Sequence, residues 1–533
     1  MFFERLGAHV RRMAPAWRAN REMGLMMNSD IQLKERLQAY LSQHIPDARS
    51  VVVERLEPIL GGASRMTYYL GYRYHWSDEQ SQRAVLRMVP ETGGFTSEGM
   101  AKEVKIFEAL RATGIPVPRA LFWSDDPKWL GSAFVIMEEV DGCESSLDGL
   151  TREPYVSMRK TIGVHFWTML SDLAKLDPVA LGLIDADDVP PLDQVWRLEL
   201  EHAKEYRALA GCDNNLLLAL LIRWLERNPP PPAPKLSVVH GDYRAGNFLY
   251  TEQGEIPLML DWELWRLGDP IIDLMYSVRP TFQDKEGNAG RLIPVAEAIE
   301  IWKRNTGFAV SQESWKWYET AQRAQSYAML ARMLTEYFAG GGRETLTYFY
   351  ALTSFTSSWP QLRQTLELPA PTVKRPSGET SPKGERIADY LRLAAKRYRG
   401  EYQQSIADGN TRKTLAIDGL ILQVVADRVE NGVFYYTQDN AELESVLRDA
   451  AESFATGALR ERIDEVLSGQ AASLRLSDLV ERNDRLCATI LAVLDAVESD
   501  LGTAARRIEA LIRQAVSNQC ERFVLPYNAL QGL

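Results

Sequence analysis

The feature that most constrains this fold is a group of short apolar runs near the middle of the chain, each ending in a polar loop. Residues 236–239 predict one short strand. Residues 248–250 and 256–260 flank a turn at Gln253-Gly254, as the two strands of a hairpin do. Polar side chains therefore gather where these strands end, and three of them matter for chemistry: Asp242, Asn247 and Asp261.

Phosphoryl transfer requires this set of side chains, because the reaction needs positioning and charge neutralisation more than covalent help. Asp242 would orient an acceptor hydroxyl and take its proton, while Asn247 and Asp261 would hold Mg²⁺ on the phosphates. In the kinase pattern four residues separate the Asp from the Asn, and the metal Asp follows a later strand, as here. The alternative is a hairpin with solvated acidic loops, and the elements upstream argue against it.

The motif differs from that of protein kinases at two places. His240-Gly241-Asp242 replaces His-Arg-Asp, and Asp261-Trp262-Glu263 replaces Asp-Phe-Gly. With Gly268-Asp269-Pro270 and Asp273, the chain resembles the aminoglycoside phosphotransferase family over about residues 30–360, nearest to its hydroxyacyl-kinase branch. The resemblance implies an α+β, two-lobed protein-kinase-like fold with an antiparallel N-lobe sheet and a mainly helical C-lobe. It also implies ATP and Mg²⁺ as cofactors.

The predicted N-lobe begins with two strands around a glycine turn, whose backbone N–H groups would cover the nucleotide phosphates. The turn residues assigned to ATP are Gly61, Gly62 and Ser64. A third strand, over 84–89, offers Arg87 where many members of the family have Lys. Glu103, on a helix predicted over 97–112, is its expected ion-pair partner, with Glu98 and Glu108 as alternatives.

A fifth predicted strand, over 133–137, leads into the segment that joins the two lobes of a kinase. The order of the elements places the adenine edge against this segment, so ATP-binding roles are assigned to Met137, Glu138 and Val140. After Asp261, Asp269 is expected to brace the loop that carries Asp242, and Asp273 to start the next helix. The residues proposed for the acceptor wall are Arg244, Trp315, Tyr318 and Tyr327, although aromatics at helical spacing usually belong to a core.

Composition limits the alternatives. The 533 residues carry a net charge of −11, so the chain has no overall basic footprint for nucleic acid. No apolar run approaches membrane-spanning length. The four widely spaced cysteines form no metal-ligand pattern and fit a reducing compartment, so we expect a cytoplasmic protein.

The chain is expected to divide into five segments. These are an N-terminal helical extension (1–45), the N-lobe (46–140), the C-lobe (141–366), a linker rich in Pro, Gly and Ser (367–386) and an all-helical domain (387–533). Within the last, helices are predicted over 411–430 and 441–455, separated by a strand or loop at 432–436. Three roles stay open for this domain: homo-oligomerisation, covering the acceptor site, or docking a partner.

The sequence thus predicts an ATP-dependent kinase that transfers the γ-phosphate to a hydroxyl of a small molecule, such as a hydroxyacyl group or another catabolic intermediate. An aminoglycoside-type antibiotic kinase is the alternative within the enzyme class. A catalytically silent kinase-like module for binding or assembly is the alternative from another class, and the intact set of Asp242, Asn247 and Asp261 argues against it.

Overall fold

The computed structural model describes residues 18–46, 51–59, 65–74, 81–89, 99–338, 359–373, 386–406, 409–454, 456–498 and 502–523. By its internal contacts the chain divides into two compact units. The first, called here the sheet unit, comprises residues 14–201 and 229–319. The second, called the helical unit, includes residues 202–228 and 320–533.

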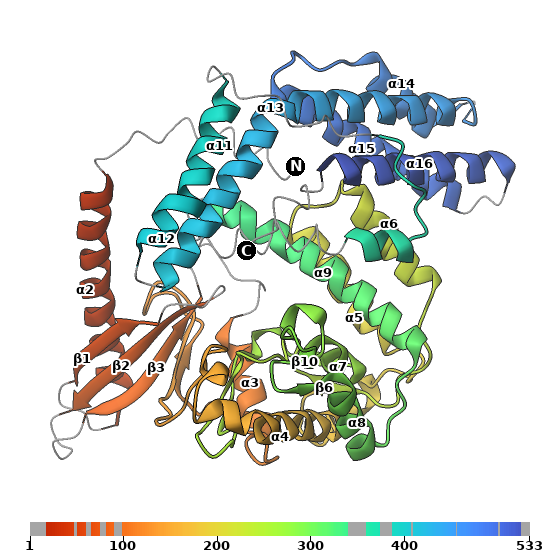
Figure 1. Ribbon diagram of the computed structural model, residues 1–533. Helices are drawn as coiled ribbons and strands as arrows, with labels where there is room; N and C mark the ends of the chain where they lie inside the picture. Colours follow the sequence, from red (N-terminus) through yellow and green to blue (C-terminus); the bar gives the residue numbers. More distant parts are fainter. Residues whose placement is uncertain are drawn as a thin grey trace. The chain divides into compact units, whose positions relative to one another are not determined.

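The sheet unit contains a five-stranded antiparallel sheet in the order β1-β2-β3-β5-β4 (Figure 1). Its strands are β1 (Val51–Pro58), β2 (Met66–Tyr74), β3 (Gln82–Met88), β4 (Ala120–Ser124) and β5 (Phe134–Glu138). Alternation along β3 buries Ala84, Leu86 and Met88 on the face covered by α2 (Arg18–His44). Arg87 therefore lies on the opposite face, towards α3 (Met100–Leu110).

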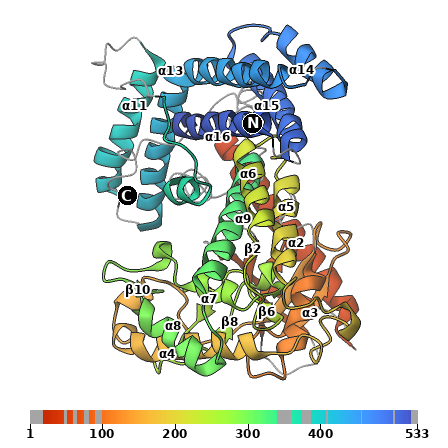
Figure 2. The ribbon, with the colours of Figure 1, turned by 90° about the vertical axis from the view of Figure 1, so that its right-hand side faces the viewer.

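The remainder of the sheet unit is mainly helical, with short paired strands (Figure 2). Its helices are α4 (Tyr155–Lys175), α7 (Ile271–Ser277) and α8 (Val295–Thr306), with α5 (Trp196–Leu209) and α9 (Gln312–Phe338) divided between the units. Its strands are β6 (Ser237–Val239), β7 (Phe248–Leu249), β8 (Leu258–Met259), β9 (Arg266–Gly268), β10 (Asn288–Ala289) and β11 (Ile293–Pro294). Its 3₁₀ turns are η2 (Gly149–Thr151), η3 (Ala186–Asp188), η4 (Trp262–Leu264) and η5 (Pro280–Phe282).

Two pairings in this region fix the geometry of the central motif. β6 pairs with β9, and β7 pairs with β8 in the predicted hairpin. The core beneath them includes Phe166 and Trp167 of α4, and the buried hydroxyl of Tyr243 donates to the Phe166 carbonyl at 2.7 Å. The α+β class, with an antiparallel N-terminal sheet and a helical remainder, is confirmed.

The helical unit is all-α over the residues that the structure describes, as expected. It contains α6 (Leu216–Arg227), α11 (Ile387–Arg397), α12 (Gln403–Ser405), α13 (Gly409–Ala451), α14 (Ala458–Ser468), α15 (Leu476–Glu498) and α16 (Thr503–Phe523). A π-helical turn, η6 (Tyr398–Tyr402), joins α11 to α12. None of the described helices is long and apolar enough to cross a membrane.

The predicted break at residues 432–436 is wrong, because α13 runs unbroken for 43 residues. The aromatic cluster there has strand propensity, but helical spacing buries Tyr435 and Tyr436 in the bundle. One turn further, the buried Asp439 carboxylate accepts hydrogen bonds from Asn483 of α15 at 2.7 Å and Gln519 of α16 at 2.8 Å. Tertiary packing therefore overrides local propensity in this helix.

A buried ion pair ties α5 to β9 within the sheet unit. The Arg266 guanidinium makes two hydrogen bonds to the Glu199 carboxylate, both 2.7 Å long, and the two side chains are only 9% and 2% exposed. Removing one partner would leave the other charge buried without its counter-ion. We therefore predict that Glu199→Ala lowers the free energy of unfolding of the sheet unit by about 3–5 kcal/mol.

The measurement is the urea dependence of hydrogen exchange in peptides from β6 and β9. The matched control is Glu108→Ala, which breaks a pair with Arg111 whose members are both 52% exposed and should cost less than about 1 kcal/mol. Equal losses of stability in the two variants would contradict the prediction.

Candidate active site

The loop at residues 240–247 is held in place by Asp273, in the first turn of α7. The backbone N–H groups of His240 and Gly241 donate to the two carboxylate oxygens of Asp273 at 2.6 and 2.9 Å. Burial raises the pKa of Asp273, and the electrostatic interaction with His240 and the two backbone N–H donors oppose that rise. Asp273 therefore fixes the start of the loop to α7.

The structure exchanges the roles predicted for Asp269 and Asp273. Asp269 precedes α7, and its carboxylate accepts the N–H of Ile271 at 2.9 Å. Burial raises the pKa of Asp269 to about 6, against hydrogen bonds from Ile271 and Tyr318. The expectation that Asp269 braces the loop is wrong, because Asp273, in the first turn of α7, accepts the loop N–H groups, while Asp269 accepts the N–H of Ile271, the first residue of the helix.

The conformation of the loop explains the residues around Asp242. The ring of His240 accepts the Asp242 N–H on Nδ1 at 3.2 Å, so its Nε2 carries the proton donated to the Leu260 carbonyl at 2.9 Å. Gly241 has a φ of +86°, and a Cβ there would lie 2.3 Å from the Leu264 carbonyl oxygen. No larger residue fits this position, which accounts for the glycine between His and Asp.

Asp242 and Asn247 are in direct contact. The Asn247 amide donates to the Asp242 carboxylate at 2.6 Å and to the Asp242 carbonyl at 2.9 Å. The Arg244 Nε donates to both carboxylate oxygens of Asp242, at 3.1 and 3.2 Å. The loop therefore presents an oriented carboxylate with a cation beside it.

Asp261 comes to the same place through the β7–β8 hairpin. The Leu260 N–H donates to the Asn247 carbonyl at 2.7 Å, so the residue after Leu260 follows directly on the paired strands. Asp261 itself has a left-handed backbone, with φ of 66° and ψ of 53°, which is uncommon for a residue other than glycine. Strained backbone of this kind is concentrated at functional sites.

A cluster of five charged side chains connects the sheet to this hairpin. Arg87 lies 2.9 Å from Glu103 through Nη1 and contacts Asp261 through Nη2, so the predicted pair of Arg87 with Glu103 is present. Arg65 completes the cluster, with Nη2 3.2 Å from Glu103 and Nε 3.0 Å from Glu263. Glu108, one of the alternative partners for Arg87, pairs with Arg111 instead, and Glu98 lies outside the described residues.

The pKa shifts in this cluster follow from its charges. Burial opposes the ionisation of Asp261, but the charge and hydrogen bond of Arg87 lower its pKa below the usual value. Burial and then repulsion from Asp261 raise the pKa of Glu263 to about 7. Two arginines face three carboxyl groups, so the cluster retains excess negative charge when all three are ionised.

Exposure separates the acids that can reach a ligand from those that hold the fold. The side chains of Asp242 and Asp261 are 14% and 28% exposed, whereas Asp269 and Asp273 are each only 2% exposed. The first two carboxylates open to solvent, and the second two are occupied by backbone N–H donors. This division leaves the Asp242 and Asp261 carboxylates accessible to a ligand.

Asn247 and Asp261 are suitable ligands for a magnesium–nucleotide complex. Among the described residues, no group of three or more His, Cys, Asp or Glu side chains could form a metal cage. Magnesium in phosphoryl-transfer sites is typically held by one or two carboxylates together with substrate phosphates, and keeps several waters. A carboxylate with an excess of negative charge around it, next to an amide oxygen, fits that kind of binding.

Sequence reasoning missed Arg65 and Glu263. Both are buried, at 6% and 4% exposure, and each contacts members of the charged cluster. A signal was present, since Arg65 directly follows the predicted glycine turn and Glu263 follows Asp261 by two residues. Their partners lie far away in the sequence, so only the fold reveals the pairing.

The other predicted site residues are placed as follows. Gly61, Gly62 and Ser64 lie outside the described residues. Met137 is buried in β5, Glu138 pairs with Arg119 at 2.9 Å, and Val140 is exposed after the strand. Trp315 packs on the edge of the sheet-unit core, and Tyr318 is buried with the Asp269 carboxylate nearby. Tyr327 belongs to the helical unit, where its hydroxyl accepts from Asn215 at 3.2 Å.

Two solved structures to which this chain is similar have TM-scores below 0.5. One is a Ralstonia eutropha protein assigned as an aminoglycoside phosphotransferase, at a TM-score of 0.45 and 22% identity, covering 62% of this chain and 97% of that one. Another is a spectinomycin phosphotransferase in complex with ADP and spectinomycin. It has a TM-score of 0.38 and 14% sequence identity, and the match covers 62% of this chain and 98% of that one. A similarity this low supports no conclusion about chemistry.

Sequence comparison is more informative. Mouse (Mus musculus) acyl-CoA dehydrogenase family member 10 is 33% identical over 225 residues, which is 40% of this chain and 19% of the relative. Rat (Rattus norvegicus) acyl-CoA dehydrogenase family member 11 is 28% identical over 287 residues, which is 52% of this chain and 34% of the relative. The chain thus spans only a fifth to a third of these two relatives.

The phosphotransferase enzyme family matches residues 55–302. That range begins in β1, ends in α8, and contains both the charged cluster and the 240–247 loop. The matched sequence and the observed geometry coincide in the same part of the molecule. Residues 55–302 of this chain therefore constitute a domain of the phosphotransferase enzyme family.

Proposed function

We propose that this chain is an ATP- and magnesium-dependent kinase that transfers the γ-phosphate to a hydroxyl group of a small molecule. The observation that carries the proposal is that Asp242, Asn247 and Asp261 come together on one loop and hairpin, with the Asp242 and Asp261 carboxylates open to solvent. Membership of residues 55–302 in the phosphotransferase enzyme family supports the same reaction class.

In the proposed reaction the acceptor oxygen bonds to the γ-phosphorus as the bridging oxygen leaves with ADP, and Asp242 receives the hydroxyl proton. The Asn247 amide fixes the Asp242 carboxylate at 2.6 Å and would offer its own oxygen to the metal, together with Asp261. Magnesium, when bound, neutralises charge that develops on the phosphates. Removal of the proton requires an ionised Asp242 carboxylate.

Arg87 would bind the non-transferred phosphates, since its guanidinium can fork onto two phosphate oxygens. The Arg87 Nη1 lies 2.9 Å from Glu103, which would hold the guanidinium in place. The Nη2 contacts Asp261, and in the proposed complex it would contact the nucleotide phosphates instead. Roles for Gly61, Gly62 and Ser64 at the phosphates, and for Met137, Glu138 and Val140 at the adenine, stay predictions from the order of elements.

The surroundings of Asp242 favour an acceptor that carries negative charge. Arg244 contacts the Asp242 carboxylate and lies over the Phe282 ring, 5.9 Å from its centroid. Arg279 lies over the ring of Tyr276 at 4.6 Å, and Tyr276 bonds to Asp242. The guanidinium groups of Arg244 and Arg279, close to Asp242, would repel a polycation such as an aminoglycoside and would attract an anionic hydroxyacyl compound.

The relatives provide a second, weaker reason to consider hydroxyacyl acceptors. Two of them are named as acyl-CoA dehydrogenase family members, so similar domains occur in chains named for acyl-CoA chemistry. A phosphorylated hydroxyl is a good leaving group, which suits a catabolic pathway. A cytoplasmic location and assembly through the helical unit remain predictions from the sequence.

For the proton acceptor, we predict that Asp242→Asn reduces kcat at least about 1,000-fold while the affinity for ATP changes little, because the variant loses the base and keeps the shape. The readout is phosphate transfer to a hydroxyacyl thioester, alongside calorimetric titration with a nonhydrolysable ATP analogue. Asp187→Asn, at an exposed position on η3, is the matched control and should behave like the parent chain. Asp242→Asn with the parental kcat would remove Asp242 from the mechanism.

For the phosphate contact, Arg87→Lys should raise the KM for ATP about tenfold, because lysine keeps the charge and loses the fork that spans Glu103 and the phosphates. Initial rates at varied ATP and saturating acceptor give this value. Lys in place of the exposed Arg111 controls for a general effect of the substitution. A KM equal to that of the parent would show that Arg87 does not contact the nucleotide.

For the acceptor, Arg244→Gln should raise the KM for an anionic hydroxyacyl acceptor about tenfold or more and leave the KM for ATP nearly unchanged, because a charge-assisted contact is lost only at the acceptor end. A panel of hydroxyacyl thioesters, free hydroxy acids and aminoglycosides is assayed with both forms. Faster turnover of the aminoglycosides than of every anionic acceptor would overturn the assignment of substrate charge.

A further inference from the structure

The helical unit contains a groove that the proposed kinase reaction does not use. Its volume is about 480 Å³, within the range of small-molecule sites. The lining residues come from α11, η6, α12 and α13: Arg392, Ala395, Lys396, Arg399, Gly400, Gln403, Ala416 and Gln423. We propose that this groove binds a small phosphate-bearing anion, either a phosphomonoester or a pyrophosphate.

The charge of the lining supports an anion. Three of the eight lining side chains are cations and none is an acid. The segment that supplies them is basic within an acidic chain: residues 386–406 contain five Lys or Arg (Arg386, Arg392, Lys396, Arg397, Arg399) and two acids (Asp389, Glu401), while the whole chain has a net charge of −11. The segment that lines most of the groove is therefore net positive, in contrast to the chain as a whole.

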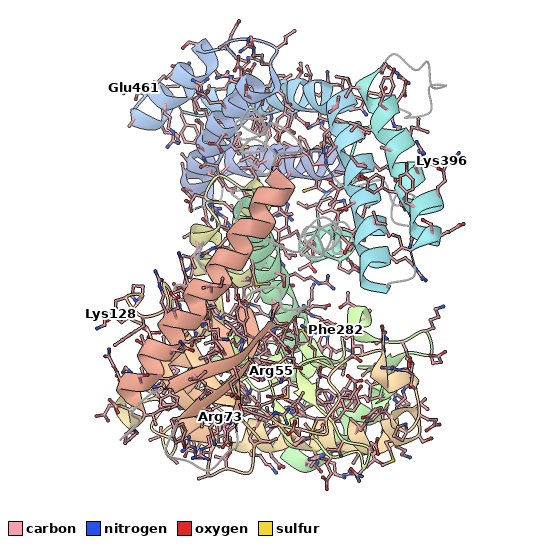
Figure 3. The ribbon with its side chains drawn as sticks, turned by 90° about the vertical axis from the view of Figure 1, so that its left-hand side faces the viewer. Arg55, Arg73, Lys128, Phe282, Lys396 and Glu461 are labelled. Atoms are coloured by element: carbon pink, nitrogen blue, oxygen red, sulfur yellow. The ribbon has the colours of Figure 1, made fainter. Side chains whose placement is uncertain are left out.

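The three cations are held to different extents. Arg392 is paired with Glu430 and lies 3.5 Å from Asp389, so its position is fixed by carboxylates outside the groove lining. Arg399 donates from Nη1 to the Gln423 side chain at 3.4 Å. Within the part of the chain that the structure describes, neither Lys396 nor Arg399 forms an ion pair, so both charges are available to an anion (Lys396 is labelled on α11 in Figure 3).

The backbone around the groove is specialised. Arg399 and Gly400 lie in the π-helical turn η6, a rare conformation that is frequent at functional sites. On the facing helix, Gly419 allows the stem of Arg399 to lie against α13, since a Cβ at that position would be 2.6 Å from the Arg399 Cγ. Glycine within a helix costs about 1 kcal/mol relative to alanine, which is consistent with selection for the placement of Arg399.

Small side chains leave room between the cations. Ala395, Ala416 and Gly400 line the groove without filling it, and Gln403 and Gln423 can donate to phosphate oxygens. Lysine and arginine ammonium and guanidinium groups bind phosphate through charge-assisted hydrogen bonds. The three cations, the two amide side chains and the space left by the small residues are together suited to a phosphate group carrying a small substituent.

The test uses the full chain, hydrogen exchange and three probes without magnesium: pyrophosphate, ADP and glycerol phosphate. Binding in the groove should slow exchange in peptides from α11 and α13, because the anion would bridge these two helices. The order of potency among the probes identifies the source of the phosphate. Protection confined to residues 240–263, or protection by an acidic peptide and by none of the phosphate probes, would overturn the proposal.

Two variants make the test specific. The double variant Lys396→Ala, Arg399→Gln should weaken the protecting probe about tenfold or more, because two charge-assisted contacts are lost. Arg397→Gln removes one positive charge from α11 next to Lys396, but Arg397 pairs with Glu401 and does not line the groove, so this variant should bind the probe like the parent. The inference would be contradicted if probe binding were weakened equally in the double variant and in Arg397→Gln, or if it were unchanged in the double variant.

A third variant keeps the inference testable if the double variant does not fold. Gly419→Ala puts a methyl group 2.6 Å from the Arg399 Cγ and 3.1 Å from the Ala395 carbonyl oxygen, so the Arg399 stem must shift and the same probe should bind more weakly. Far-ultraviolet circular dichroism checks that the helices are retained in this variant. Kinase turnover is measured in parallel, because the groove and the proposed active site are separate claims. Absence of probe binding with normal kinase turnover would count against the groove alone. Probe binding without kinase turnover would count against the proposed kinase reaction alone.

Discussion

The proposed chemistry depends first on a buried carboxylate that accepts two backbone N–H groups. Asp273 holds the N–H groups of His240 and Gly241 and so fixes the point at which β6 becomes the 240–247 loop. The next residues of the loop are positioned relative to this point. The His240 ring carries its proton on Nε2, Gly241 has a left-handed backbone, and Asn247 holds the Asp242 carboxylate. Buried polar groups with complete hydrogen bonding are rigid, and a catalytic carboxylate requires that rigidity.

A second constraint joins the sheet to the hairpin by charge. Arg87 on β3 contacts both Glu103 on α3 and Asp261 after β8, and Arg65 lies between Glu103 and Glu263. Under the proposed function, such a cluster places Arg87, assigned to the phosphates, and Asp261, assigned to the metal, in one network before any ligand arrives. Ligand binding then exchanges ion pairs within the network instead of assembling it.

Contacts that depend on local sequence pattern could be predicted from the sequence, and contacts that depend on tertiary packing could not. The spacing of Asp242, Asn247 and Asp261, and the order of strand and helix that pairs Arg87 with Glu103, depend on local pattern and were recovered. The roles of Asp269 and Asp273 were exchanged because they depend on a two-residue difference in where α7 begins. The contacts of Arg65 with Glu103 and Glu263, and the unbroken α13, depend on tertiary packing, which no local pattern encodes.

The central claim is that Asp261 and Asn247 bind magnesium on a nucleotide beside Asp242. The most direct measurement is the affinity for a nonhydrolysable ATP analogue by calorimetry, with magnesium and with EDTA, in the parent chain and in Asp261→Asn. We predict that magnesium strengthens binding about tenfold or more in the parent, and that this gain is largely lost in the variant. Affinity that is independent of magnesium in the parent, or the same gain in both forms, would contradict the account.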